Sequence, residues 1–273
     1  MFVRTARVNV FQCVFCGSLV IQHAAMSSVN DPWSVSTITP DFLGALRLRR
    51  FLQARQIVSI LRDELQDRRV LDYGCGQGEF VRLLLQQGFD AYGCDISNLY
   101  VESSALGERF MQIVEPWSMP TGLNYSVISM FDVLEHARHP DEVVRRLRQS
   151  SAELAIIKVP MLNGPIGMTA RILAKAKSTA LLERLLLVGE VAPHYSFYTS
   201  AGLIQLFKAQ RFELKRAFRI ADVGQELPAR MRGGDRKSRP IMANILRLAG
   251  GILSVCAPVW SDTRVFVFQK EPV

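Results

Sequence analysis

Features that mark several special classes of protein are scarce in this chain. Five cysteines among 273 residues are too few for a disulfide scaffold, and their odd number leaves at least one thiol free, which favours a reducing compartment. Proline and glycine occur in ordinary numbers, 12 and 18, while hydrophobic residues make up 49% of the chain. This composition argues against a disordered, collagen-like or coiled-coil protein. A chain of this length buries enough surface to fold without a metal ion or a disulfide.

No segment has the pattern of a clear export signal or an uninterrupted membrane span. Residues 8–21 are partly apolar but contain polar side chains, so we expect no exported leader, and Met26 is an alternative start. Cys13 and Cys16 have the spacing of half a zinc knuckle, but no second pair of cysteines follows, and we expect no metal there. Residues 241–260 are apolar but are interrupted by an arginine, a glycine pair and a proline. We expect this segment to be buried, with docking on a membrane surface as the alternative.

The net charge of +8 is concentrated in one part of the chain. Residues 208–247 hold eleven lysines or arginines against four acidic residues, and five of the basic residues surround a glycine pair within residues 230–239. We expect a solvated basic loop there. An electrostatic contact with phosphate groups or with an anionic membrane is the alternative.

A predicted strand, a glycine-rich turn and a helix follow one another in the first half of the chain. Apolar residues at helical spacing in 42–65 predict an amphipathic helix, and residues 70–73 predict a short buried strand. Helical periodicity resumes over residues 79–88, after a turn that contains three glycines. Strand, glycine-rich turn and helix come in the order that a nucleotide-type site requires.

The glycines of this turn are followed by an acidic residue on the next predicted strand. Glycine permits unusual backbone dihedral angles and lets the backbone approach a ligand closely. Residues 91–96 predict a second strand that carries Asp95, whose carboxylate can accept hydrogen bonds from both hydroxyls of a ribose. A nicotinamide fingerprint requires a third glycine where this chain has Glu79, and no phosphate-binding P-loop sequence occurs. The pattern therefore favours a ligand without phosphate, such as S-adenosylmethionine.

Three stretches of the chain together resemble the class I S-adenosylmethionine-dependent methyltransferases. Residues 70–78, with the sequence VLDYGCGQG, resemble motif I of that family, and residues 93–95 resemble the acidic end of its second strand. Residues 127–136, which end in Leu-Glu-His and are followed by Pro140, resemble the fourth strand and its loop in a subgroup with an L-E-H signature. This subgroup includes ubiquinone-type O-methyltransferases and bacterial small-molecule methyltransferases. The resemblance covers roughly residues 45–160 well and the remainder weakly.

The resemblance implies a role in cofactor binding for each matching residue. It implies that Asp95 holds the ribose of S-adenosylmethionine and that Ile96 lies beside the adenine. Glu115 lies about where relatives carry the residue that reaches the adenine amine, with a surface carboxylate as the alternative. The residues implied to hold the methionine portion are Asp72, Gly74, Cys75, Gly76 and Gly78.

His136 is the predicted catalytic residue. Methyl transfer to a hydroxyl requires removal of a proton, and an imidazole with a pKa near neutrality, at the end of a strand that faces the cofactor, can accept it. Glu135 could orient the ring, or the Glu-His pair could join a divalent metal, as the resemblance to ubiquinone-type enzymes permits. A structural role for His136 in capping the loop is the other alternative. On sequence grounds alone we assign no metal ligand.

The second half of the chain is predicted to complete the sheet. Residues 154–160 predict a fully buried fifth strand, while residues 212–215 and 264–268 predict the sixth and seventh strands. A long insert, residues 161–193, separates strands five and six. Its residues 170–188 predict a basic amphipathic helix, placed where the family usually builds a lid over its acceptor, and this helix could also rest on a bilayer.

The predicted fold is a Rossmann-like, doubly wound α/β sheet of seven mostly parallel strands with a helical lid. We expect an N-terminal extension over residues 1–41 and a methyltransferase domain over residues 42–273. His194 and Tyr195 are predicted either to line the acceptor pocket or to pack in the core. The ligand should lie at the carboxyl ends of strands one, two and four.

The predicted function is methyl transfer from S-adenosylmethionine, most readily to an oxygen of a small-molecule or lipid-linked acceptor. An RNA-modifying methyltransferase, favoured by the basic loop, and a non-catalytic cofactor-binding partner subunit are the alternatives. No recognisable RNA-binding module supports the first alternative. Because the donor is made in the cytosol, we expect a cytoplasmic protein, with peripheral contact to the inner membrane left open.

Overall fold

The computed structural model of the chain describes residues 3–5, 8–23, 40–96, 106–162, 164–186, 194–220 and 263–272. The basic residues 230–239 and the apolar residues 241–260 lie outside this part of the chain. None of the described helices is both long and apolar enough to cross a membrane.

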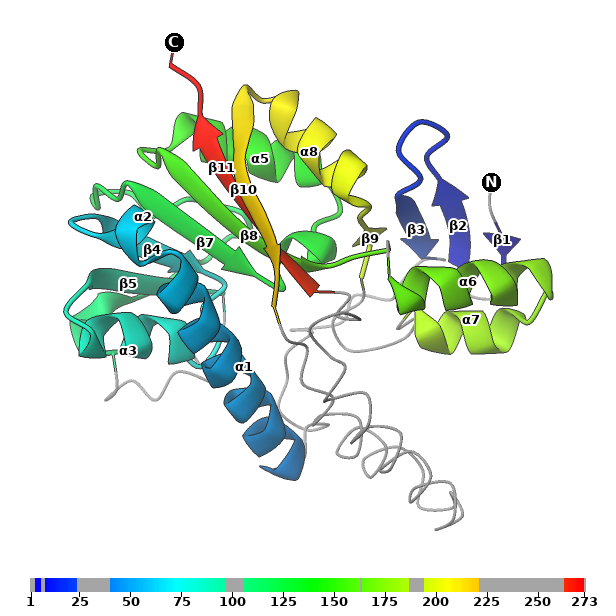
Figure 1. Cartoon of the computed structure of the whole chain (residues 1–273), viewed down its shortest axis with the longest axis horizontal. Coiled ribbons are helices and arrows are strands. Elements are labelled where there is room, and N and C mark those ends of the chain that lie inside the picture. The colour runs from blue at the N-terminus through cyan, green and yellow to red at the C-terminus, as the bar shows by residue number, and fades with distance from the viewer. Residues whose placement is uncertain are drawn as a thin grey trace.

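Seven strands form the main sheet, in the order β10-β11-β8-β7-β4-β5-β6 (Figure 1). The first five strands in chain order are parallel to one another, while β11 runs antiparallel to both of its neighbours. The predicted doubly wound, mostly parallel sheet of seven strands is therefore confirmed. The strands are β4 (Arg69–Tyr73), β5 (Asp90–Asp95), β6 (Phe110–Gln112), β7 (Val127–Phe131), β8 (Leu154–Pro160), β10 (Phe212–Arg219) and β11 (Thr263–Lys270).

The central strands are almost entirely apolar because helices cover both faces of the sheet. Neighbouring residues of one strand point to opposite faces, so that Val70 packs with α1 and α3 on one face and Leu71 packs with α5 and α8 on the other. Thr199 caps α8 by accepting a hydrogen bond from the amide of Gly202, as its place before the helix predicts. The elements around the sheet are α1 (Pro40–Ile60), α2 (Arg62–Leu65), α3 (Glu79–Gln86), α5 (Pro140–Gln149), α8 (Ser200–Lys208) and the 3₁₀ turns η2 (Gly107–Arg109) and η3 (Leu134–His136).

A second, antiparallel sheet lies beside the main one and was not predicted from the sequence. Its strands β1 (Val3–Arg4), β2 (Val8–Gln12), β3 (Leu19–His23) and β9 (Ser196–Phe197) pair in that order. Two helices of the lid insert, α6 (Pro165–Lys175) and α7 (Thr179–Leu185), replace the single predicted helix and lie below this sheet in Figure 1. The apolar sides of β2, β3 and the two helices share one small core. The boundary between an extension over residues 1–41 and a domain over residues 42–273 stays a prediction.

Candidate functional site

The glycine loop (residues 74–78) connects β4 to α3 and has a backbone that side chains would obstruct. Gly74, Gly76 and Gly78 all have positive φ angles, of 73°, 53° and 74°. A Cβ atom on Gly74 would lie 2.5 Å from Cγ2 of Val133, far inside van der Waals contact. The positive φ angles thus favour glycine at all three positions, and Gly74 is also required for the close approach of the loop after β7. Between them lies Cys75, which is buried beneath the loop.

The carboxylate of Asp95 is joined to this loop across the ends of two parallel strands. β4 and β5 are paired so that Tyr73 faces Cys94, which brings the loop after β4 next to the end of β5. The amide of Gly76 donates a hydrogen bond of 2.8 Å to Oδ2 of Asp95. The structure therefore brings together the two features that the sequence singled out, and the hydrogen bond fixes the shape of the loop.

Asp72 is buried in the sheet directly below the glycine loop. The hydroxyl of Ser129 on β7 donates a hydrogen bond of 2.7 Å to its Oδ1. Burial raises the pKa of Asp72 to about 7, a shift that the Ser129 hydrogen bond only partly offsets. Its predicted role in holding the methionine portion of a cofactor stays a prediction.

The two residues assigned to the adenine lie in different surroundings. Ile96 is half-buried and packs against the main core, just beyond the end of β5. Glu115 is exposed in the turn after β6, where its carbonyl oxygen accepts hydrogen bonds from the amide and hydroxyl of Ser118. The adenine roles of both residues stay predictions.

A buried lysine on β8 pairs with the residue after β7 and is linked to α1, an arrangement that was not predicted from the sequence. Lys158 on β8 is 2% exposed, its Nζ lies 2.7 Å from Oδ2 of Asp132, and it donates a hydrogen bond of 2.8 Å to Gln53. Asp132 follows β7 with an unusual positive φ of 57°. Burial alone would raise the pKa of Asp132, but the charges of Lys158 and Arg49 outweigh burial and hold it at about 2. The one available signal was a lysine inside an otherwise apolar strand.

Helix α1 covers the glycine loop with basic side chains. Arg47 donates a hydrogen bond of 2.6 Å to Gln77 in the loop. The guanidinium of Arg50 lies 2.9 Å from the point where a Cβ on Gly76 would be. Arg50 also lines, together with Asp72 and Lys158, a small cavity of about 30 Å³ beside the loop. The predicted helix before motif I is therefore part of the site as well as part of the core.

His136 lies in the η3 turn, just after β7, as the position of the sequence motif predicts. The neighbouring Val133 contacts Gly74, so the turn begins at the edge of the glycine loop. His136 is half-buried, whereas Glu135 is 1% exposed. Burial and the nearby charge of Asp132 raise the pKa of Glu135 well above its usual range.

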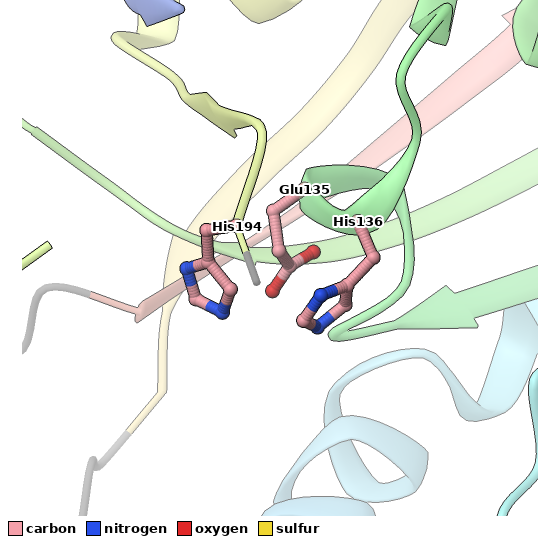
Figure 2. A group of neighbouring side chains, drawn as sticks. All are labelled: Glu135, His136 and His194. Carbon is pink, nitrogen blue, oxygen red and sulfur yellow. The ribbon is translucent and has the colours of Figure 1, made fainter. Parts of the chain in front are cut away.

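The structure brings His194 next to this turn. The imidazole rings of His136 and His194 meet edge to face with their centres 4.7 Å apart. Figure 2 shows the Glu135 carboxylate between the two rings, and one potential ligand atom from each of the three residues lies within 4.8 Å of the others. Tyr195, the other residue predicted for the acceptor pocket, has its ring under the guanidinium of Arg138 at 5.2 Å. We call Glu135, His136 and His194 the histidine cluster.

Two hydrogen bonds to carbonyl oxygens of η3 hold the segment of His194 against this turn. The amide of Tyr195 donates a hydrogen bond of 2.8 Å to the carbonyl oxygen of Glu135, and the hydroxyl of Tyr198 donates one of 3.2 Å to that of Leu134. On the other side, the amide of Ile21 in β3 donates to the carbonyl oxygen of Tyr195 at 2.8 Å. The N-terminal strands therefore support the histidine cluster from behind.

Comparison with known proteins identifies the family of the chain. A family model described as a methyltransferase domain matches residues 46–216. The ubiquinone biosynthesis O-methyltransferase of Bordetella avium (strain 197N) is 32% identical over 93 residues, which are 31% of this chain and only 39% of that relative's length.

Two solved structures show the same fold at low sequence identity. The magnesium protoporphyrin IX methyltransferase of Synechocystis PCC 6803, with bound S-adenosylhomocysteine, is 15% identical with a TM-score of 0.52, covering 88% of this chain and 91% of that one. A phosphoethanolamine N-methyltransferase of Haemonchus contortus is 14% identical with a TM-score of 0.57, covering 93% of this chain and 63% of that one. At these identities the likeness establishes the fold and leaves the acceptor open.

Proposed function

The chain belongs to the methyltransferase-domain family, and on that premise we propose that it transfers a methyl group from S-adenosylmethionine to an oxygen of a small or lipid-linked acceptor. One observation carries the proposal, namely the hydrogen bond between the amide of Gly76 and the carboxylate of Asp95. It supports a single site made of a glycine-rich loop and an acidic strand end. A sulfonium nucleoside, which carries no phosphate, suits such a site, because the loop has neither the lysine nor the sequence of a phosphate-binding P-loop.

The residues around the glycine loop fit the parts of this donor. We propose that Asp95 holds the ribose and that Asp72, Cys75 and the three loop glycines surround the methionine portion. Arg50, which lines the cavity beside the loop, offers a positive charge for the carboxylate of that portion. We assign Ile96 and Glu115 to the adenine, as the resemblance implies. When bound, the donor supplies an electrophilic methyl group on a positively charged sulfur.

We propose that His136 is the catalytic residue. Its turn follows β7 and is adjacent to the glycine loop through the contact between Val133 and Gly74, so an acceptor at His136 would lie close to the donor. The acceptor oxygen must lose a proton when it attacks the methyl group, and His136 can promote this loss by accepting the proton. Positioning the acceptor in line with the methyl group and the sulfur supplies much of the remaining rate.

A lipid-linked acceptor is supported by the outer face of the lid insert. Met168 and Ile172, one turn apart on α6, are 62% and 63% exposed, and Arg171 and Lys175 on the same helix are also exposed. Apolar side chains flanked by basic ones are typical of helices that lie on an anionic bilayer. We therefore propose a cytoplasmic enzyme whose α6 contacts the inner membrane surface.

The proposal is tested by incubating the protein with methyl-labelled S-adenosylmethionine and a fractionated lysate. We expect label in the small-molecule or lipid fraction, and we expect His136→Ala to reduce the rate by about 100-fold or more, the usual contribution of a positioned acid or base. The matched control is His139→Ala, an exposed histidine in the residue before α5 whose side chain makes no capping hydrogen bond. Label in the RNA fraction would show that the acceptor is RNA and not a small or lipid-linked molecule. Transfer of label into none of the fractions would contradict the proposal.

A further inference from the structure

We propose that the histidine cluster is a binding site for one divalent transition-metal ion, with Glu135, His136 and His194 as its ligands. The catalytic use of such an ion rests on the proposed function, but its binding does not. The three residues come from two segments 58 positions apart in the sequence, and only the fold places His194 beside the Leu-Glu-His turn.

The type and number of ligand atoms in the histidine cluster suit a metal ion. Two imidazole nitrogens and one carboxylate oxygen, all within 4.8 Å of one another, need only small side-chain movements to close on an ion at about 2.1 Å from each. Three protein ligands leave at least one coordination position open, which is the arrangement of catalytic metal sites. Structural sites, in contrast, are closed by a fourth protein ligand.

The buried carboxylate of Glu135 needs a positively charged partner. Glu135 is 1% exposed, and among the described residues none donates a hydrogen bond to its Oε2. A buried carboxylate oxygen without a donor is costly, so such groups are normally paired or coordinate a metal. Lys158, a buried cation whose charge acts on Glu135, is already paired with Asp132. A cation between Glu135 and the two histidines would satisfy the oxygen that this pair leaves out.

Hydrogen bonds hold the backbone that carries the three proposed ligands in place. The segment of His194 is tied to η3 by the amide of Tyr195 and the hydroxyl of Tyr198, and it is tied to β3 through Ile21. Tyr198 is further linked to the lid insert, because the amide of Leu162 donates a hydrogen bond to its carbonyl oxygen at 2.8 Å. Ligands held on fixed backbone lose little entropy when an ion binds, so the site is preorganised.

The donor set also selects the class of ion. The mixed set suits first-row transition ions, because imidazole favours iron, nickel and zinc while the carboxylate favours manganese, whereas magnesium and calcium prefer oxygen ligands alone. An acceptor hydroxyl that occupies the open position would lose its proton to solvent water more readily, because the ion stabilises the oxygen anion that then attacks the methyl group. With the ion bound, His136 would act on the acceptor as a metal ligand instead of accepting its proton.

The test is metal binding by the full chain after chelator treatment. Mn²⁺ is titrated calorimetrically, since manganese has little affinity for the thiols of Cys13 and Cys16. Co²⁺ is followed by its visible absorption, which reports nitrogen ligands, in a Cys13→Ser/Cys16→Ser background. We expect one ion per chain, about 100-fold weaker binding for His194→Ala and for Glu135→Gln, and binding within twofold of wild type for His139→Ala.

Binding of S-adenosylhomocysteine, measured on the same samples, separates this inference from the proposed function. A wild type that binds the nucleoside but no ion, or that binds the ion equally well without His194, overturns the metal site and leaves methyl transfer standing. Metal binding that depends on the histidine cluster, in a protein that does not bind the nucleoside, supports the metal site and contradicts the proposed function. If His194→Ala fails to fold, the isosteric Glu135→Gln variant decides between these outcomes.

Discussion

The glycine loop and the histidine cluster lie at the carboxyl ends of neighbouring parallel strands, yet they are assembled from very different lengths of chain. The glycine loop and the two carboxylates proposed to bind the donor, from Asp72 to Asp95, lie within one strand-turn-helix-strand unit, which we call the donor end. The region proposed to bind the acceptor, which we call the acceptor end, is built from η3, residues 194–198 and strand β3, which lie far apart in the sequence. A local unit is fixed by a few short-range contacts, whereas the acceptor end depends on long-range packing. The predictions below break one end while leaving the other intact, from the largest expected effect to the smallest.

The largest effect is expected where the two ends meet, at the buried pair of Lys158 and Asp132. Replacing Lys158 by methionine would leave Asp132, whose side chain is 21% exposed, with the more distant Arg49 as its remaining counter-charge, at a cost of about 3 kcal/mol in the free energy of unfolding. Urea unfolding measures this loss. The control is Lys208→Met at an exposed position on α8, where we expect a change below about 0.5 kcal/mol. A loss under 1 kcal/mol for Lys158→Met would show that the pair is dispensable.

The pKa of Asp72 predicts how the stability of the donor end depends on pH. Because its pKa is about 7 in the folded state and 3.8 in the unfolded state, the folded state binds more protons between these values. Stability contributed by this group is therefore greatest below pH 4 and falls as the pH rises, by about 1.4 kcal/mol per unit between pH 5 and 6 and by less as the pH passes 7. Asp72→Asn should lack this fall and still accept the Ser129 hydrogen bond. If the free energy of unfolding changes with pH in the same way in the wild type and in Asp72→Asn, the raised pKa of Asp72 is refuted.

The acceptor end should loosen by itself when β3 is weakened. Ile21 is 2% exposed in the core shared by β2, β3, α6 and α7, so Ile21→Ala should cost about 2–3 kcal/mol locally. Hydrogen exchange should then speed up at the amides of Tyr195 and Leu162, while binding of S-adenosylhomocysteine stays within twofold. Val20→Ala, on the exposed face of the same strand, is the control. Equal loss of nucleoside binding would mean that the two ends do not act separately.

The donor end could largely be predicted from the sequence, whereas most of the acceptor end could not. The glycine loop, Asp95 and the Leu-Glu-His turn could be predicted because each lies in a short contiguous pattern whose geometry depends on its neighbours in the chain. The pairing of β3 with β9 could not, since the strands are only two to five residues long and their partners are about 175 residues apart. Likewise the counter-charge of Lys158 and the position of His194 come from distant segments, and no local pattern indicates them.

The donor end should fail when its loop is obstructed. Gly74→Ala would place a Cβ 2.5 Å from Val133 in a backbone conformation that side chains rarely adopt. We expect at least about tenfold weaker binding of S-adenosylhomocysteine, which corresponds to about 1.4 kcal/mol, with metal binding retained. Gly88→Ala is a matched control, because Gly88 also has a positive φ, of 83°, but has open space around it. Calorimetry on both variants tests the difference, and identical affinities would contradict it.

The smallest effect is expected at the lid surface. Ile172→Asp should reduce flotation of the protein with phosphatidylglycerol vesicles by about fivefold, as the loss of roughly 1 kcal/mol of surface attraction implies. Leu48→Asp, at a 47% exposed position on α1, should leave flotation unchanged. Flotation that is equally strong for both variants, or absent in the wild type, would remove the membrane contact from the proposal.

The central claim is that the glycine loop and Asp95 form one binding site for the methyl donor. It is tested most directly by calorimetric titration of the folded chain with S-adenosylhomocysteine, the demethylated product. We expect one molecule bound per chain and at least about tenfold weaker binding for Asp95→Ala, with Asp90→Ala at the opposite end of β5 within twofold of wild type. No binding to the folded wild type, or equal affinity in all three proteins, would contradict the claim.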